Sequence, residues 1–262
     1  MDANVKSADG VPITYQVSGS GNPTLVFVHG WCCDKSHWEP QVSNFAQKYK
    51  TVTIDLAGHG ESGLDRDKWT MAAFGEDVAA VANHLGPDQV VLIGHSMGAV
   101  VILEAAQRMP NVVGIVGVDS FFDVNQKVSL PQSGGLATLR SSPPEVARDW
   151  MRTFVSIMFI EKSDPALVEK ITSAMSSAPR EVAIGALEET FSYDLGQALE
   201  KATVPVWCIS SDYHPFDLEA TRQHCPSFEM MFMSGVGHFV MLEDPATFNR
   251  LLEEIIQNLV VK

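Results

Sequence analysis

Residues 90–106 read VVLIGHSMGAVVILEAA, and this stretch decides the fold of the chain. Its first four residues are apolar and mostly β-branched, which predicts a buried strand. The residues from Ala99 onward favour a helix, which Pro110 limits. A G-x-S-x-G motif between a strand and a helix predicts a sharp turn that presents a serine nucleophile. Gly94 and Gly98 permit the turn, because a Cβ at either position would collide with the facing backbone.

The overall composition is that of a globular protein with one sizeable core. The chain has 262 residues, of which 45% are hydrophobic and 19% are charged. Eighteen basic and thirty-two acidic residues give a net charge of −14. An acidic surface argues against nucleic acids and anionic membranes as partners. We therefore expect no nucleic-acid partner and no membrane partner, and the sequence leaves the oligomeric state open.

The spacing of the cysteines and the first six residues favour a cytoplasmic location. Cys32, Cys33, Cys208 and Cys225 lack the spacing of a zinc site, and the first two are too close for an ordinary disulfide. The first six residues, MDANVK, lack the apolar region of a secretory signal, and no apolar run is long enough to span a bilayer. We therefore expect reduced thiols, no metal and a cytoplasmic location.

Strands and helices alternate on both sides of the central motif. Short apolar runs predict buried parallel strands, and the segments between them have helical periodicity. The strands are expected at 24–28, 51–54, 112–118, 204–209 and 228–233, and the helices at 38–48, 70–85, 216–224 and from 245 onward. This alternation predicts an α/β fold with a mostly parallel sheet. Residues 3–17 are expected to form a hairpin around Asp9-Gly10.

The alternation stops between residues 120 and 200. Three helical segments with start signals are expected there, at 145–159, 166–175 and 181–191. An all-helical insertion in a βα chain is typical of a lid over a site. We therefore predict a core formed by residues 1–119 and 201–262, with residues 120–200 as an inserted helical lid.

His238 is the candidate general base. A serine hydroxyl is a poor nucleophile until a base accepts its proton, and an imidazole can exchange protons near neutral pH. Of the eight histidines, His238 follows Gly237 on a loop just past the last predicted strand. This position distinguishes it from the histidines of the other motifs, which we expect to form hydrogen bonds within loops.

Several motifs occur in the order that one family uses. His29-Gly30, residues 55–62, residues 94–98, Asp212 and Gly237-His238-Phe239 together resemble a lidded α/β-hydrolase of the carboxylesterase type. The resemblance covers essentially the whole chain. It implies a mostly parallel central sheet flanked by helices, with a helical lid inserted after the strand that ends at Asp119. It also implies a catalytic triad of Ser96, His238 and an acid.

The resemblance favours Asp212 as the acid, because this residue follows the strand that usually carries it. The usual pattern has a glycine before the acid, whereas this chain has Ser210-Ser211. Asp119 is the alternative, because some members of the family place the acid after the preceding strand. Asp217 ranks third.

The backbone N–H groups of Trp31 and Met97 are expected to form the oxyanion hole. Candidate residues for the substrate pocket are Trp31, Phe121, Phe154, Met158 and Phe239. The predicted lid is rich in Met and Phe, which favours an uncharged acyl group. The expected substrates are therefore small to medium uncharged esters.

The leading hypothesis is a serine hydrolase that cleaves small-molecule carboxylic esters without a cofactor. Haloalkane dehalogenases and epoxide hydrolases are excluded, because they use Asp where this chain has Ser96. Lactonases, thioesterases and perhydrolases share the same triad and remain alternatives. A receptor-like α/β-hydrolase with slow turnover, which binds a small ligand, is an alternative from a different class.

Overall fold

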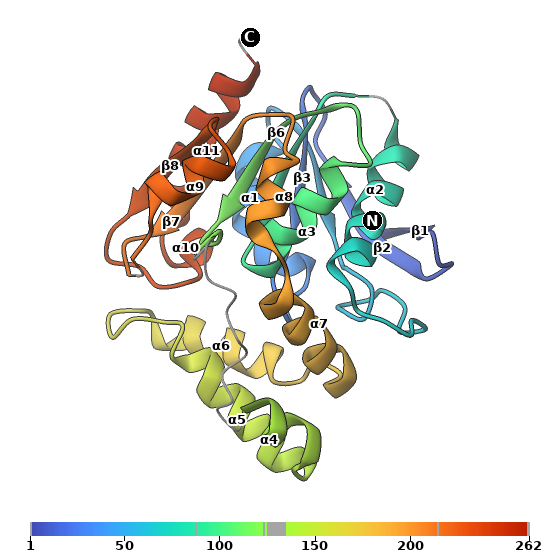
Figure 1. Ribbon diagram of the computed structural model, residues 1–262, viewed down its shortest axis with the longest axis vertical. Helices are drawn as coiled ribbons and strands as arrows, with labels where there is room; N and C mark the ends of the chain where they lie inside the picture. The colour runs from blue at the N-terminus through green and yellow to red at the C-terminus, as the bar shows by residue number, and fades with distance from the viewer. Residues whose placement is uncertain (1, 87, 123, 125–134, 214, 261–262) are drawn as a thin grey trace.

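The computed structural model describes residues 2–86, 88–122, 124, 135–213 and 215–260. Within the predicted insertion at 120–200, residues 123 and 125–134 therefore lie outside the described residues. Figure 1 shows a core built around a sheet, with helices α4, α5 and α6 together on one side of it. None of the helices in the described ranges is long and apolar enough to cross a membrane.

Eight strands of the described chain form one sheet in the order β1-β2-β4-β3-β5-β6-β7-β8. The strands β1 and β2 form an antiparallel hairpin, β2 is antiparallel to β4, and all other neighbouring pairs are parallel. The prediction of a mostly parallel sheet is confirmed. The bounds are β1 Asp2–Lys6, β2 Pro12–Ser18, β3 Thr24–Val28, β4 Lys50–Ile54, β5 Val90–His95, β6 Val112–Val118, β7 Val206–Ser211 and β8 Phe228–Met233.

The strands that precede Trp31, Ser96 and Asp119 lie at the middle of the sheet. All residues of β3 and β5 are buried, as expected for apolar strands covered on both faces. Val28 pairs with Gly94, and His95 pairs with Val118, so β3, β5 and β6 end at nearly the same level. The residues that follow these strands are therefore brought together at one edge of the sheet, which is where ligands bind in open α/β folds.

Two groups of helices flank the sheet. Helices α1 and α11 pack against each other, whereas α2 packs on α3, and α3 packs on α8. Helix α2 begins after Thr70, whose hydroxyl accepts a hydrogen bond from the Ala73 N–H at 3.1 Å. The bounds are α1 Glu39–Phe45, α2 Met71–Leu85, α3 Met97–Ala106, α9 Leu218–His224, α10 Val240–Glu243 and α11 Pro245–Val260.

Five helices of the described chain follow β6 and precede β7. They are α4 Gly135–Ser141, α5 Pro144–Ser156, α6 Pro165–Met175, α7 Arg180–Ser192 and α8 Leu195–Glu200. We call residues 135–200 the helical insertion. Helices α5, α6 and α7 match the three predicted helices within a few residues at each end. Figure 1 shows α4, α5 and α6 on the side of the core where β6 ends.

Three short helices, α4, α8 and the four-residue α10, and one boundary differ from the sequence prediction. Helices α4 and α8 have seven and six residues, which is too short for a clear helical period. The predicted helix at 38–48 is a 3₁₀ turn, η1 Lys35–Trp38, followed by α1. Its start is set by Asp34, whose carboxylate accepts the Ser36 N–H at 2.8 Å.

Candidate active site

Ser96 lies in a strained turn between β5 and α3. Its backbone has φ +52° and ψ −120°, a conformation that L-residues rarely adopt and that often occurs at functional sites. A Cβ on Gly94 would lie 2.3 Å from the Gly98 carbonyl oxygen, and one on Gly98 would lie 2.5 Å from the Val28 carbonyl oxygen. The two glycines are therefore required sterically, as the sequence indicated. Ser96 is half-buried, so it is not sealed in the core.

The backbone of Ser96 is fixed by the end of the neighbouring strand. Its N–H donates to the Val118 carbonyl at 2.9 Å, and its carbonyl accepts the Ser120 hydroxyl at 3.0 Å. Asp119 lies between these two partners in the sequence. Hydrogen bonds between Ser96 and the residues just before and just after Asp119 thus fix the serine turn against the end of β6.

His238 is hydrogen-bonded to Asp119. The distance from His238 Nδ1 to Asp119 Oδ2 is 2.6 Å. An ionised carboxylate only accepts hydrogen bonds, so Nδ1 carries the proton and Nε2 of the neutral ring keeps its lone pair. This is the tautomer that a general base toward a serine requires. The His238 side chain is 17% exposed, whereas that of Asp119 is fully buried.

Asp119 is held as a carboxylate by several donors. Its Oδ1 accepts the Ser210 hydroxyl at 2.8 Å, the Ser211 hydroxyl at 2.8 Å and the Ser211 N–H at 2.7 Å. Burial alone would raise the pKa of Asp119, but the hydrogen bonds from His238, Ser211 and Ser210 outweigh it and hold the pKa below its ordinary value. The buried acid therefore stays negative beside the imidazole.

The preference for Asp212 as the partner of His238 was wrong. Asp212 is exposed, and its N–H donates to the Met233 carbonyl at 3.1 Å, which extends the pairing of β7 with β8. Strand β6 lies next to β5 in the sheet, whereas β7 is one strand further away. The alternative acid, Asp119, is the residue that reaches His238. Asp217 instead caps α9, where its carboxylate accepts the Ala220 N–H at 2.9 Å.

His95 supports His238 and was not predicted to do so. Its Nε2 lies 3.0 Å from the His238 carbonyl oxygen, and the two rings lie 4.6 Å apart. Because a carbonyl only accepts, Nε2 of His95 carries a proton. Burial, together with the nearby His238, lowers the pKa of His95 well below its ordinary value, so the ring is neutral. The adjacency of His95 to Ser96 in the motif was the only signal in the sequence.

The two predicted oxyanion donors flank the serine turn. Met97 is the first residue of α3, where a backbone N–H has no acceptor within the helix. Trp31 follows Gly30, at which a Cβ would lie 3.2 Å from the Cβ of Ser96. In the described ranges neither N–H donates a hydrogen bond. Free N–H groups beside a nucleophile are suited to stabilise an oxyanion.

Trp31, Phe154 and Met158 lie where the helical insertion meets the core. The Trp31 indole N–H donates to the Ala183 carbonyl of α7 at 2.8 Å, and the Trp31 and Phe154 rings meet edge to face at 5.7 Å. The Met158 carbonyl accepts the His238 N–H at 2.8 Å. These three residues therefore remain candidates for the substrate pocket.

The other two pocket candidates serve in packing. Phe121 is 2% exposed, meets Phe228 edge to face at 6.0 Å and covers Gly117. Phe239 is fully buried and stacks on Phe159 with ring centroids 4.9 Å apart. Both rings fill the core around the site, so the prediction that they line the substrate pocket is not supported.

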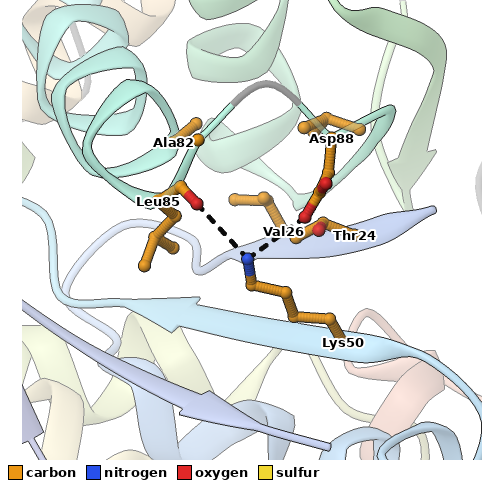
Figure 2. A pocket seen from close by; sticks show the side chains of 8 residues that line it. Thr24, Val26, Lys50, Ala82, Leu85 and Asp88 are labelled. Atoms are coloured by element: carbon orange, nitrogen blue, oxygen red, sulfur yellow. Dashed lines mark hydrogen bonds and ion pairs between the residues drawn. The ribbon is translucent and has the colours of Figure 1, made fainter. Parts of the chain in front are cut away.

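A small pocket lies at the opposite edge of the sheet. Figure 2 shows Lys50 in it, with Nζ 3.4 Å from the Leu85 carbonyl oxygen and 3.3 Å from Asp88 Oδ2. Thr24, Lys50 and Val90 line this pocket and are the first residues of their strands, whereas Ser96 and Asp119 follow the ends of theirs. The pocket is thus separate from the candidate active site. No group of metal-ligating side chains occurs in the part of the chain that the structure describes.

Comparisons with known proteins identify the family and the fold. Residues 25–251 match the model of a family described as "Alpha/beta hydrolase family". The chain belongs to the alpha/beta hydrolase family. A curated relative of this hydrolase, 3-oxoadipate enol-lactonase 1 of Acinetobacter baylyi, is 24% identical, and the match covers 97% of each chain.

Solved structures share the fold of this hydrolase. A bromoperoxidase from Bacillus anthracis superposes with a TM-score of 0.84 at 18% identity, covering 98% of this chain and 100% of the other. An esterase from Exiguobacterium antarcticum superposes with a TM-score of 0.83 at 19% identity, with the same coverage. At these identities the likeness establishes the fold alone.

Proposed function

We propose that this hydrolase cleaves carboxylic esters of small to medium uncharged substrates through an acyl-enzyme on Ser96. The observation that carries the proposal is the 2.6 Å hydrogen bond between His238 and the buried Asp119, beside a serine in a strained turn. Together these groups supply a nucleophile, a base and an acid that orients the base.

In the proposed reaction, His238 Nε2 takes the proton from Ser96 as the serine oxygen attacks the ester carbonyl. The oxyanion that forms accepts hydrogen bonds from the Trp31 and Met97 N–H groups. The imidazolium is stabilised by Asp119 and gives its proton to the departing alcohol, which leaves the acyl group on Ser96. Water, deprotonated by His238, then attacks the acyl-enzyme and releases the acid.

The helical insertion is proposed to act as a lid over this site. Support comes from the contacts of Phe154 and Met158 with Trp31 and His238, which place residues of the insertion beside the candidate machinery. Aromatic and thioether groups favour an apolar acyl group. A lid also excludes water, which strengthens the electrostatic interactions inside the site.

The first test replaces the nucleophile. Ser96→Ala is expected to abolish turnover of p-nitrophenyl acetate and butyrate, because no other group then attacks the ester. A fluorophosphonate probe should label the wild type and leave the variant unlabelled, with the two proteins showing equal melting temperatures. Labelling of the variant, or turnover that persists in it, would contradict the assignment.

Lactone hydrolysis is the second candidate. A lactone is an internal ester and would pass through the same acyl-enzyme, and the enol-lactonase relative aligns over nearly the whole chain. Comparing kcat/KM for γ-butyrolactone with that for ethyl butyrate separates the two functions. A higher value for the lactone would favour a lactonase.

A further inference from the structure

Glu243 has a position that the proposed chemistry leaves unexplained. It is the last residue of α10, and both of its carboxylate oxygens lie 3.0 Å from the Gly237 N–H nitrogen. Its Oε1 also accepts the Phe239 N–H at 3.2 Å. Glu243 thus binds the residues on both sides of His238, five positions further along the chain.

The same carboxylate binds the helical insertion. The Ser163 hydroxyl donates to Glu243 Oε2, and the Ser163 oxygen accepts the Ile160 N–H at 3.1 Å. These hydrogen bonds connect the turn between α5 and α6 with the loop between β8 and α10. We call this loop, residues 234–239, the His238 loop. We call residues 158–163 the contact turn.

The contact turn approaches the His238 loop closely in two other places. The Met158 carbonyl accepts the His238 N–H, and the Phe159 ring stacks on Phe239. A Cβ on Gly237 would lie 2.6 Å from the Met158 carbonyl oxygen and 3.0 Å from Glu243 Oε1. The glycine before the candidate base is therefore needed for this contact.

The backbone N–H and carbonyl of His238 and the N–H groups of the residues on either side of it are thus held. Its N–H binds Met158, its carbonyl binds His95, and the flanking N–H groups bind Glu243. A catalytic base must be held within about 0.5 Å of its productive position by its supporting residues. Glu243 supplies this support from the core and shares it with the insertion.

We propose that Glu243 is a positioning residue that fixes His238 and couples it, through Ser163, to the helical insertion. The inference rests on the proposed role of His238 as the base. Movement of the contact turn away from the core would remove bonds to His238 and Glu243. The base is therefore held by all of these bonds only while the contact turn is docked.

The test compares two substitutions at Glu243. Glu243→Ala removes every bond that Glu243 makes to the loop and leaves those of Met158 and His95. We expect kcat for p-nitrophenyl butyrate to fall about 10- to 100-fold with KM within threefold, because misplacement by about 1 Å costs that much. Glu243→Gln keeps an oxygen for the Gly237 and Phe239 N–H groups, and its amide can donate to Ser163. It should restore kcat to within about fivefold of wild type.

The adjacent residue supplies a matched control. The Asp244 carboxylate accepts the Thr247 N–H at 3.0 Å at the start of α11, and among the described residues it forms no hydrogen bond with His238. Asp244→Ala is expected to lower the melting temperature while leaving kcat unchanged. A fall in kcat in Asp244→Ala equal to that in Glu243→Ala would mean that general loosening explains both, and would overturn the proposal.

Ser163→Ala tests the coupling to the insertion and also serves if Glu243→Ala does not fold. It removes one hydroxyl, and we expect kcat to fall about three- to tenfold with KM nearly unchanged. A wild-type kcat in this variant would overturn the coupling to the insertion.

A measurement without substrate separates this inference from the proposed function. The His238 Nδ1 proton shared with Asp119 should give a low-field proton resonance in the wild type and in Asp244→Ala. We expect this resonance to be broadened or lost in Glu243→Ala and restored in Glu243→Gln. An unchanged resonance in Glu243→Ala would overturn the positioning role, whereas a wild type inactive on all esters and lactones would count against the proposed function alone.

Discussion

The two oxygens of Asp119 have different partners. Oδ1 is occupied by Ser210 and Ser211, and Oδ2 is left for His238. The serines that replace the usual glycine pattern before Asp212 therefore have a direct use, because their hydroxyls keep the neighbouring acid ionised. The two serines in place of a glycine thus accompany the second departure from the family pattern, the acid after β6 in place of one after β7.

Removing the charge of Asp119 is expected to cost far more than removing that of Asp212. Asp119→Asn should lower kcat by about 10⁴, by analogy with the serine-protease triad, because His238 would lose its tautomer and its counter-charge. Asp212→Asn should stay within about twofold of wild type, since its side chain is exposed. Acylation rates from stopped-flow mixing with p-nitrophenyl acetate give the comparison. A larger loss in Asp212→Asn would restore that residue as the acid.

The sequence alone predicted those site residues whose position follows from the local motif around them. Ser96 was identified because a strand, a tight turn and a helix surround it, and His238 because it follows the last strand. Choosing between Asp119 and Asp212 required knowing which strand end faces the imidazole, which depends on long-range packing. Glu243 was missed for the same reason, since its partner in the insertion, Ser163, lies 80 positions away in the sequence.

At the scale of elements, two buried histidines join the loops after β3 and β4. His29 Nδ1 donates to the Gly30 carbonyl at 2.8 Å, and its Nε2 accepts the Leu56 N–H at 3.1 Å. His59 packs beside it with ring centroids 4.9 Å apart. Burial lowers the pKa of His29 to about 4 and that of His59 to about 3. Both rings are therefore neutral in the folded protein.

These histidines make stability depend on pH. In the unfolded chain they titrate near 6.5, so between pH 6.5 and about 4 the unfolded state binds more protons than the folded state. Their contribution to stability is therefore fully present above pH 6.5 and is lost as pH falls toward 4 for His29 and toward 3 for His59. Melting temperatures measured from pH 8 to pH 4 should decline below 6.5, and the decline should be shallower in His59→Gln. Parallel curves for the two proteins would contradict this explanation.

The predicted elements differ in how well their boundaries could be foreseen. Helices α5, α6 and α7 carry start signals and several turns of apolar spacing, and all three were predicted. Helices α4 and α8 are about two turns long, so their formation depends on what they pack against rather than on their own sequence.

At the scale of the whole molecule, the charge of −14 acts on every approaching substrate. We expect neutral butyrate esters to have a higher kcat/KM than monoesters of succinate with the same leaving group, because the protein repels the carboxylate. Raising the salt from 20 to 500 mM should increase kcat/KM for the anionic ester and leave that for the neutral ester nearly unchanged. Equal salt responses would indicate that the field at the site is not negative.

Because Asp119 is the carboxylate that binds His238, the segment after β7 supplies no group to the proposed chemistry. Asp212 and Asp217 are exposed, and the second of these only starts α9. In an enzyme whose acid followed β7, any change of length there would displace the acid. Here a change of length just after β7 would leave the acid in place, provided that Phe216 keeps its stacking on Phe228. The segment that carries the acid in the usual pattern thus has a packing role in this chain and no catalytic group in the proposed mechanism.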